Sequence, residues 1–123
     1  MGGRGTFAVG NMVEYTYEKI GEIEGVKVLA GLNGKHGLPE ESHRSRAYIK
    51  LDHNGFFRMM RIYDRDHYLT FELAYHVEPN LDKSKKPILH YHLYDRDFNR
   101  TVAIKATKAM RRHFKKYLKG IKL

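Results

Sequence analysis

The sequence predicts an α+β fold, in which an antiparallel β-sheet of about four to six strands packs on one long basic C-terminal helix. Between residues 13 and 94, apolar and polar residues alternate in several short segments, a pattern typical of half-buried strands. Between residues 102 and 121, apolar residues recur every three or four positions, which is the period of a helix. An antiparallel sheet needs a cover on one face, and this apolar stripe can provide it.

Length and composition set the limits of the fold. A chain of 123 residues can bury one modest core but not two. We expect glycine-rich residues 1–12 to be a flexible N-terminus and residues 13–123 to form a single α+β domain. The absence of cysteine excludes disulfides, thiol catalysis and cysteine-ligated zinc. No apolar run is long enough to cross a membrane, so we expect a soluble, cytoplasmic protein with no cofactor and no membrane contact.

The strands are predicted in chain order. Residues 13–32 are rich in β-forming side chains and contain Glu24-Gly25, a suitable two-residue hairpin turn. Residues 31–45 hold several glycines and predict a long loop, and loops of that length often carry function. Four further strands are predicted at residues 47–51, 56–63, 68–78 and 88–94.

The last quarter of the chain predicts a helix of about five turns, from Thr101 to Lys119. Candidate N-caps are Asp97, Asn99 and Thr101, and Gly120 stands where a helix commonly ends. The apolar stripe consists of Val102, Ala106, Met110, Phe114, Tyr117 and Ile121.

Charge is distributed unevenly along the chain. Residues 100–123 hold nine Lys and Arg and no Asp or Glu, whereas residues 1–99 hold fourteen of each sign, so the whole net charge of +9 falls in this segment. Solvated helices usually mix signs, so the pattern favours contact with nucleic acid or with an acidic or nucleic-acid-binding protein over a merely solvated face. The candidate contacts are Lys105, Lys108, Arg111, Arg112, Lys115, Lys116 and Lys119, with Lys35, His43, Arg44 and Arg46 in the loop as a second region.

Histidines gather on the two strands at residues 68–78 and 88–94. If these strands pair antiparallel, alternation places Glu72, His76, His90 and His92 on one face, opposite the apolar one. Two of these imidazoles could cleave RNA without a metal, one as base and one as acid, with Lys35 or Arg44 from the loop stabilising the charge that develops on the phosphate. His76, His90 and His92 could instead hold a divalent metal. Our default interpretation is a set of half-exposed polar residues on the solvent face, with no metal.

A four-residue sequence occurs twice. Residues 63–66 and 94–97 both read Tyr-Asp-Arg-Asp, and each copy follows a predicted strand. Aspartate side chains commonly accept hydrogen bonds from the backbone of their own turn. We therefore expect a shared turn structure rather than a paired functional site.

Three segments carry a resemblance. The start at residues 1–5 (MGGRG), the loop at 34–40 (GKHGLPE) and residues 90–92 (HYH) ahead of a lysine-rich C-terminus resemble small proteins encoded in prophages and mobile elements of Gram-positive bacteria. The resemblance implies an accessory protein, a nucleic-acid binder, a nuclease or an inhibitor of host defences, and it carries over no catalytic residue. We expect nucleic-acid or nucleoprotein binding. The alternatives are a His-dependent ribonuclease and a protein-directed inhibitor of a host nuclease such as a CRISPR effector. Exposed edge strands would also allow a homodimer.

Overall fold

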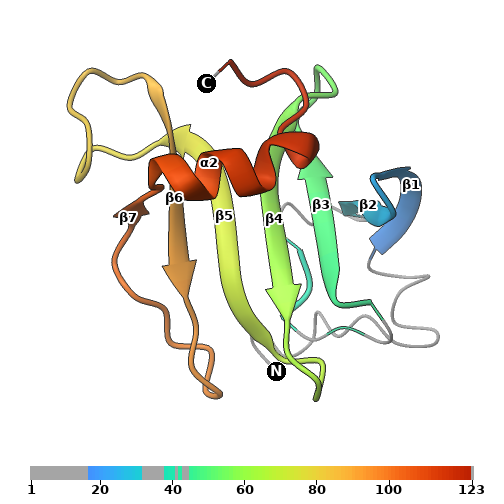
Figure 1. Ribbon diagram of the computed structural model, residues 1–123. Coiled ribbons are helices and arrows are strands. Elements are labelled where there is room, and N and C mark those ends of the chain that lie inside the picture. The colour runs from blue at the N-terminus through green and yellow to red at the C-terminus, as the bar shows by residue number, and fades with distance from the viewer. Residues whose placement is uncertain (1–16, 32–37, 41, 43–44, 123) are drawn as a thin grey trace.

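The protein is mostly β-structure, as seen in a computed structural model that describes residues 17–31, 38–40, 42 and 45–122 (Figure 1). Its elements are β1 (Tyr17–Ile23), β2 (Val26–Gly31), β3 (Ala47–Leu51), β4 (Phe57–Tyr63), β5 (Leu69–Val77), β6 (Pro87–Leu93), β7 (Ile104–Lys105), α2 (Lys108–Phe114) and the 3-10 helix η2 (Lys115–Tyr117). The strands form one sheet in the order β1-β2-β3-β4-β5-β6-β7. All neighbours are antiparallel except β2 and β3, which pair in parallel. Segment 1–12 lies outside the described residues.

The predicted fold class was wrong, because the sheet is mixed and has seven strands, and because the C-terminal helix is short. Helix α2 begins at Lys108 rather than at Thr101. The preceding residues extend the sheet instead, since β7 pairs with β6 and an isolated bridge joins Tyr94 to Arg100. Val102, which was assigned to the apolar stripe, is 82% exposed. The actual N-cap is Thr107, whose side-chain oxygen accepts a hydrogen bond from the backbone N–H of Met110 at 3.1 Å.

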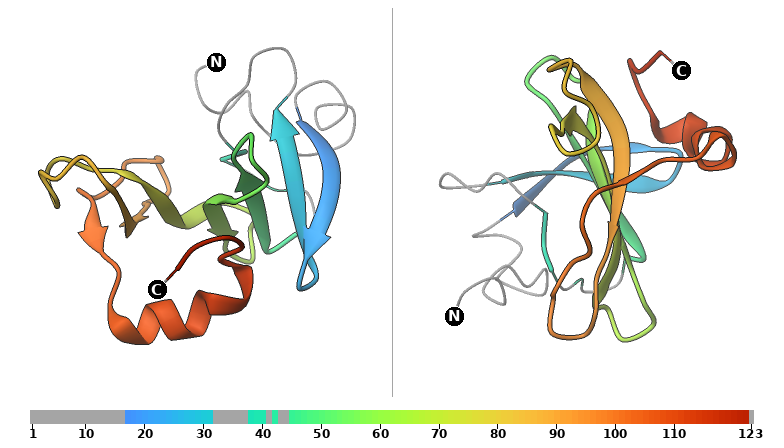
Figure 2. Two further views of the ribbon diagram at one scale, coloured as in Figure 1. Left: turned by 90° about the horizontal axis from the view of Figure 1, so that it is seen from above. Right: turned by 90° about the vertical axis from the view of Figure 1, so that its left-hand side faces the viewer.

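The helical segment covers one face of the sheet. Figures 1 and 2 show α2 lying across the middle of that face, on the side away from the grey N-terminal trace. Met110, Phe114 and Tyr117 pack onto the main core cluster, together with Leu118 after η2. The ring of Phe114 stacks on Phe71 of β5, with ring centroids 5.7 Å apart. The buried members of this cluster are Val28, Ile49, Phe57, Met60, Leu73, Leu89, Ala106, Phe114 and Leu118.

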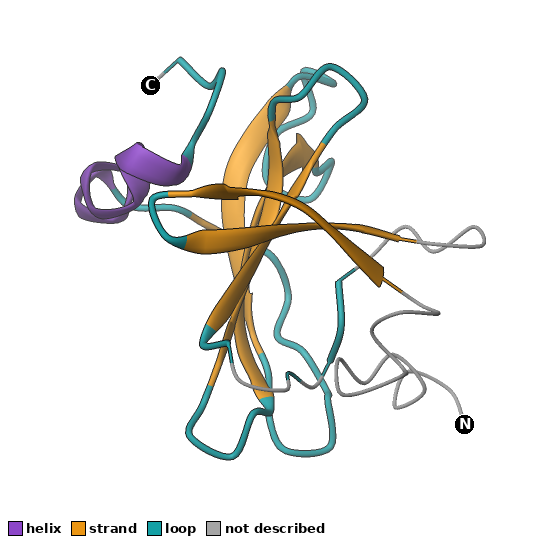
Figure 3. Ribbon diagram, turned by 90° about the vertical axis from the view of Figure 1, so that its right-hand side faces the viewer, coloured by secondary structure: helices purple, strands orange, loops and turns teal. Residues whose placement is uncertain are grey.

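A second apolar cluster lies on the opposite face of the sheet. Its buried residues are Tyr17, Leu29, Leu38, Tyr48, Tyr63 and Leu69. The backbone after β2 returns to this face, where the Tyr63 hydroxyl donates to the Pro39 carbonyl at 2.5 Å. Figure 3 shows the β1–β2 pair crossing the other strands at a steep angle, with its turn on the side of α2. The sheet therefore has a core on both faces.

Three hairpin turns share one hydrogen-bond pattern, led by Asp52, Asp64 and Asp95. In each turn, one carboxylate oxygen accepts from the backbone N–H groups two and four residues later, over 2.8–3.1 Å. The residue three positions after the aspartate has a positive φ: +81° at Gly55, +70° at His67 and +63° at Phe98. The shared turn predicted for the two Tyr-Asp-Arg-Asp segments is confirmed. The Glu24-Gly25 hairpin turn is also confirmed, with φ of 49° and 81°.

Candidate functional site

The C-terminal cations lie on the outer side of α2 and η2, at the end of β7 and on the turn that follows η2. Packing of Met110 and Phe114 against the sheet turns the intervening positions outward. Arg111 is half-buried, and its guanidinium Nη1 donates to the Ala106 carbonyl at 3.3 Å. Lys116 Nζ lies 5.1 Å from the centre of the Tyr117 ring. The exposed cations of this surface, here called the basic surface, are Lys105, Lys108, Arg112, Lys115, Lys116, Lys119 and Lys122.

Among the described residues, no carboxylate forms an ion pair with the basic surface. Within the described part of the chain, ion pairs join Lys19 to Glu22, Arg61 to Glu72, and Arg96 to Asp64 and Asp66. No carboxylate among these residues lies within 4 Å of a cation from residues 105–122. Positive charge that is not paired within the protein remains available to an external anion.

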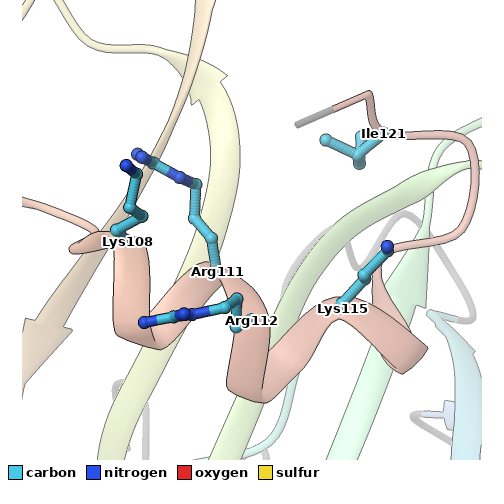
Figure 4. Close-up of a pocket in the computed structure, with 5 residues that line it drawn as sticks. All are labelled: Lys108, Arg111, Arg112, Lys115 and Ile121. Atoms are coloured by element: carbon cyan, nitrogen blue, oxygen red, sulfur yellow. The ribbon is translucent and has the colours of Figure 1, made fainter.

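A hollow of about 280 Å³ opens beside α2. Figure 4 shows Lys108 and Arg111 reaching in the same direction from the helix, with Lys115 pointing toward Ile121 of the C-terminal segment. Arg112 is the fourth cation of its lining. Four cations around one apolar side chain form a strongly positive concavity, which suits phosphate or carboxylate groups.

The loop proposed as a second contact region is described only in part. Lys35, His43 and Arg44 lie outside the described residues. Arg46 is exposed, and its Nε donates to the Tyr63 carbonyl at 3.2 Å. It lines a second hollow, of about 340 Å³, together with Tyr117 at the end of η2. Arg46 and Tyr117 therefore border the same concavity, and Lys116 of the basic surface lies beside the Tyr117 ring.

The histidine face is confirmed in its register but is not a solvent face. In the β5–β6 ladder, Glu72 lies opposite His92 and Ala74 opposite His90. The His90 ring contacts those of His76 and His92, with centroid distances of 4.6 and 5.5 Å. His90 is fully buried and His92 is 4% exposed, so the expectation of half-exposed polar residues was wrong for both; His76 is half-buried.

Each of these imidazoles is fixed by a backbone carbonyl. The Nδ1 atoms of His76, His90 and His92 lie 2.8–3.0 Å from the carbonyls of Val77, Ile88 and Thr101. Because a carbonyl only accepts, each Nδ1 carries the proton. Burial lowers the pKa of His90, the neighbouring imidazoles lower it further, and its hydrogen bond to Ile88 opposes the shift. His90 is therefore neutral near pH 7, and its buried Nε2 has no hydrogen-bond partner among the residues that the structure describes.

A buried ionic network beside the histidines was not foreseen. The Tyr94 hydroxyl donates to Glu72 Oε2 at 2.6 Å, and Arg61 Nη2 lies 3.7 Å from the same oxygen. Arg61 Nη1 also donates to the Leu38 carbonyl at 2.6 Å. The network fixes the returning chain onto the sheet. The available sequence signal was Arg61, a charge that alternation places on the same face as Met59 and Tyr63.

The imidazoles and the basic surface lie on opposite faces of the sheet. Alternation along β5 and β6 sends Leu73 and Tyr91 toward α2, and Glu72, His90 and His92 away from it. One phosphate therefore cannot contact both the imidazoles and the basic surface. The ribonuclease hypothesis pairs the imidazoles with Lys35 instead, which lies outside the described residues, so that alternative stays a prediction. No group of three or more metal-ligating side chains that could hold a metal is found in the described segments. Among the same residues, no helix is long and apolar enough to cross a membrane.

Comparisons with protein families, curated proteins and solved structures found no match to this chain.

Proposed function

We propose that this protein binds nucleic acid through the basic surface on α2, η2 and the adjoining turns. The observation that carries the proposal is a set of clustered cations without carboxylate partners among the described residues, four of which surround one hollow. Phosphate contacts of this kind release condensed counterions, and they supply most of the affinity in binding that does not depend on base sequence.

The test is binding of labelled duplex DNA and single-stranded RNA across a salt series. Contact with about six phosphates predicts a slope of log K on log salt near −5 for duplex DNA. Changing Lys108, Arg111, Arg112 and Lys115 to Gln should make that slope shallower by about 3 to 4 and weaken binding at every salt concentration.

A matched control removes the same charge elsewhere. Arg65, Lys83, Lys85 and Lys86 are exposed and lie in the β4–β5 and β5–β6 connections. Their replacement by Gln should leave most of the salt slope intact. Equal losses in the two variants would show that net charge alone causes binding, and would overturn the assignment to this surface. No binding at near-physiological salt would overturn the proposal, as would cleavage of the RNA that is abolished by His90→Ala or His92→Ala.

A further inference from the structure

The hollow between Arg46 and Tyr117 lies on the helix-covered face of the sheet. Its lining comes from the β1–β2 turn, β2, the start of β3, β4 and the end of η2. Apolar atoms come from Val26, Ala47, Met60 and Ile62, and the half-buried Tyr117 ring adds an aromatic wall. Lys27 and Arg46 are the charged residues of the lining, but the register that pairs Lys27 with Tyr48 sends the Lys27 side chain to the other face of the sheet, so Arg46 is the cation that the lining offers.

An apolar row continues this hollow across the sheet. The strand registers place Ala47 opposite Ile62, Ile62 opposite Phe71, and Phe71 opposite Leu93. The next row toward α2 begins with Ile49, Met60 and Leu73, all of them buried beneath the helical segment. Leu93, in contrast, is 46% exposed, and the other three residues of the outer row are half-buried. Figure 1 shows the starts of β3 and β5 and the ends of β4 and β6 below α2, near the β4–β5 turn.

We propose that the hollow receives an unpaired nucleobase, so that the protein prefers single-stranded nucleic acid to duplex. This inference rests on the proposed function and names its substrate class. An aromatic wall with cations at its rim is the combination that binds single strands, because the base packs on the ring while the phosphate meets the positive charge. Paired bases are stacked inside a duplex and cannot enter such a hollow.

Charge complementarity selects this occupant over an apolar segment of another protein. Lys116 Nζ lies 5.1 Å from the centre of the Tyr117 ring, so a cation stands beside the aromatic wall. Arg46 is exposed on the β3 side of the hollow. Lys116 of the basic surface therefore neighbours the hollow through the Tyr117 ring, and a strand that crosses that surface can place a base at Tyr117 while its phosphates stay near Lys116.

The experiment compares a short fluorescein-labelled oligothymidylate with an oligomer of the same length in which every base is replaced by an abasic tetrahydrofuran unit. Both probes carry the same phosphates, so they differ only in their bases. Fluorescence anisotropy should show the base-containing probe binding about fivefold to a hundredfold more tightly, the range expected for stacking of one base. An equally long duplex should bind more weakly than the single strand.

Substitutions test whether the difference in affinity between the two probes arises at the hollow. Tyr117→Leu should abolish the preference for the base-containing probe, and Tyr117→Phe should retain it. Tyr75→Leu is the matched control, because Tyr75 is half-buried in the same core cluster but does not line the hollow, and it should leave the preference unchanged. Thermal unfolding of each variant confirms that it is folded at the assay temperature.

The outcomes separate the two proposals. Salt-dependent binding that is equal for the base-containing and abasic probes would overturn the nucleobase site and leave the proposed function standing. A base preference that survives in Tyr117→Leu, or is lost equally in Tyr75→Leu, would also overturn the site. Failure of both probes and the duplex to bind at near-physiological salt would overturn the proposed function together with the inference.

Discussion

Arg96 Nη2 lies 2.6 Å from Asp66 Oδ2 and joins the two copies of the Tyr-Asp-Arg-Asp sequence. The same guanidinium nitrogen is 3.0 Å from Asp64, and the guanidinium carbon lies 4.7 Å from the centre of the Tyr68 ring. The Tyr68 ring in turn stacks on Phe98 of the second turn, with centroids 5.7 Å apart. The two turns are therefore neighbours in space, held together by Arg96 and the aspartates of the repeated sequence and by the stacked rings of Tyr68 and Phe98.

Arg96→Gln should release this contact and change the acid titration of Asp66. The hydrogen bond and the positive charge of Arg96 hold the pKa of Asp66 below its ordinary value of 3.8. A lowered pKa stabilises the fold above about pH 4, and this contribution disappears as the pH falls through the folded-state value. Carboxyl NMR titration should show the pKa of Asp66 rising in the variant, and the stability difference from the parent protein should shrink in acid.

Arg65→Gln is the matched control for Arg96→Gln. Arg65 occupies the same place in the first copy of the repeat, is exposed, and forms no ion pair with a described residue. This variant should leave the titration of Asp66 unchanged. An equal rise in the pKa of Asp66 in both variants would show that net charge, rather than the Arg96 contact, lowers it.

Gly120→Ala should destabilise the protein more than Gly25→Ala. Both glycines have positive φ, of 79° and 81°, so alanine costs about 1–2 kcal/mol at either position. A Cβ at Gly120 would also collide with the Phe56 ring, whereas a Cβ at Gly25 meets nothing within 4 Å. The collision adds about 1–3 kcal/mol to the loss in the free energy of unfolding, which urea denaturation measures.

The double variant Gly120→Ala/Phe56→Ala isolates the collision. Removal of the ring should recover part of the loss caused by Gly120→Ala, in comparison with the effect of Phe56→Ala alone. Strict additivity of the two substitutions would contradict contact between Gly120 and the ring.

Tyr94→Phe should weaken the fold by about 1.5 kcal/mol at neutral pH, because it removes a hydrogen bond to the buried Glu72 carboxylate. Burial, followed by the negative charge of Glu72, raises the pKa of Tyr94 to about 12. A raised pKa stabilises the fold below about pH 10, and this stabilisation is lost as the pH rises toward 12. Ultraviolet titration should therefore lose one late-ionising tyrosine in the variant.

Tyr68→Phe is the comparison for Tyr94→Phe. Its hydroxyl makes no hydrogen bond to a described residue, so the late ionisation should persist in this variant. Urea denaturation at pH 7 should also show a smaller loss than for Tyr94→Phe. If the two variants lose equal stability, the Tyr94–Glu72 hydrogen bond contributes nothing measurable.

Local signals in the sequence predicted most strands and turns. Alternation along β5 and β6 fixed which side chains share a face, and the Glu24-Gly25 and Asp-led turns follow from the chemistry of four or five residues. The predicted start of the helix was wrong, because the spacing of Val102 and Ala106 is that of a helix. In the structure, residues 104–105 pair with β6 instead. A strand that joins an existing sheet is stabilised by its partner, which lies elsewhere in the chain.

The sequence predicted which cations cluster in the candidate site, but not the hollows that they border. Charge counting located Lys108, Arg112 and Lys115, because a run without carboxylates is visible in the sequence. Tyr117 was assigned only to the core. Helical periodicity shows which residues form the apolar stripe, but not which of them also borders a hollow at the surface. The burial of His90 also escaped prediction, because alternation shows which face a residue occupies and not what covers that face.

The parallel pairing of β2 with β3 has a consequence for how the chain folds. From β3 to β7 each strand pairs with the next one along the chain, so these contacts close short loops and can form early. Lys27–Tyr48 and Val28–Ile49 are the register pairs that join β1–β2 to the rest, and they form only when residues 32–46 close a longer loop. The largest loss of chain entropy on folding therefore falls on the pairing of β2 with β3. We expect the β1–β2 hairpin to join the sheet last and to separate from it first.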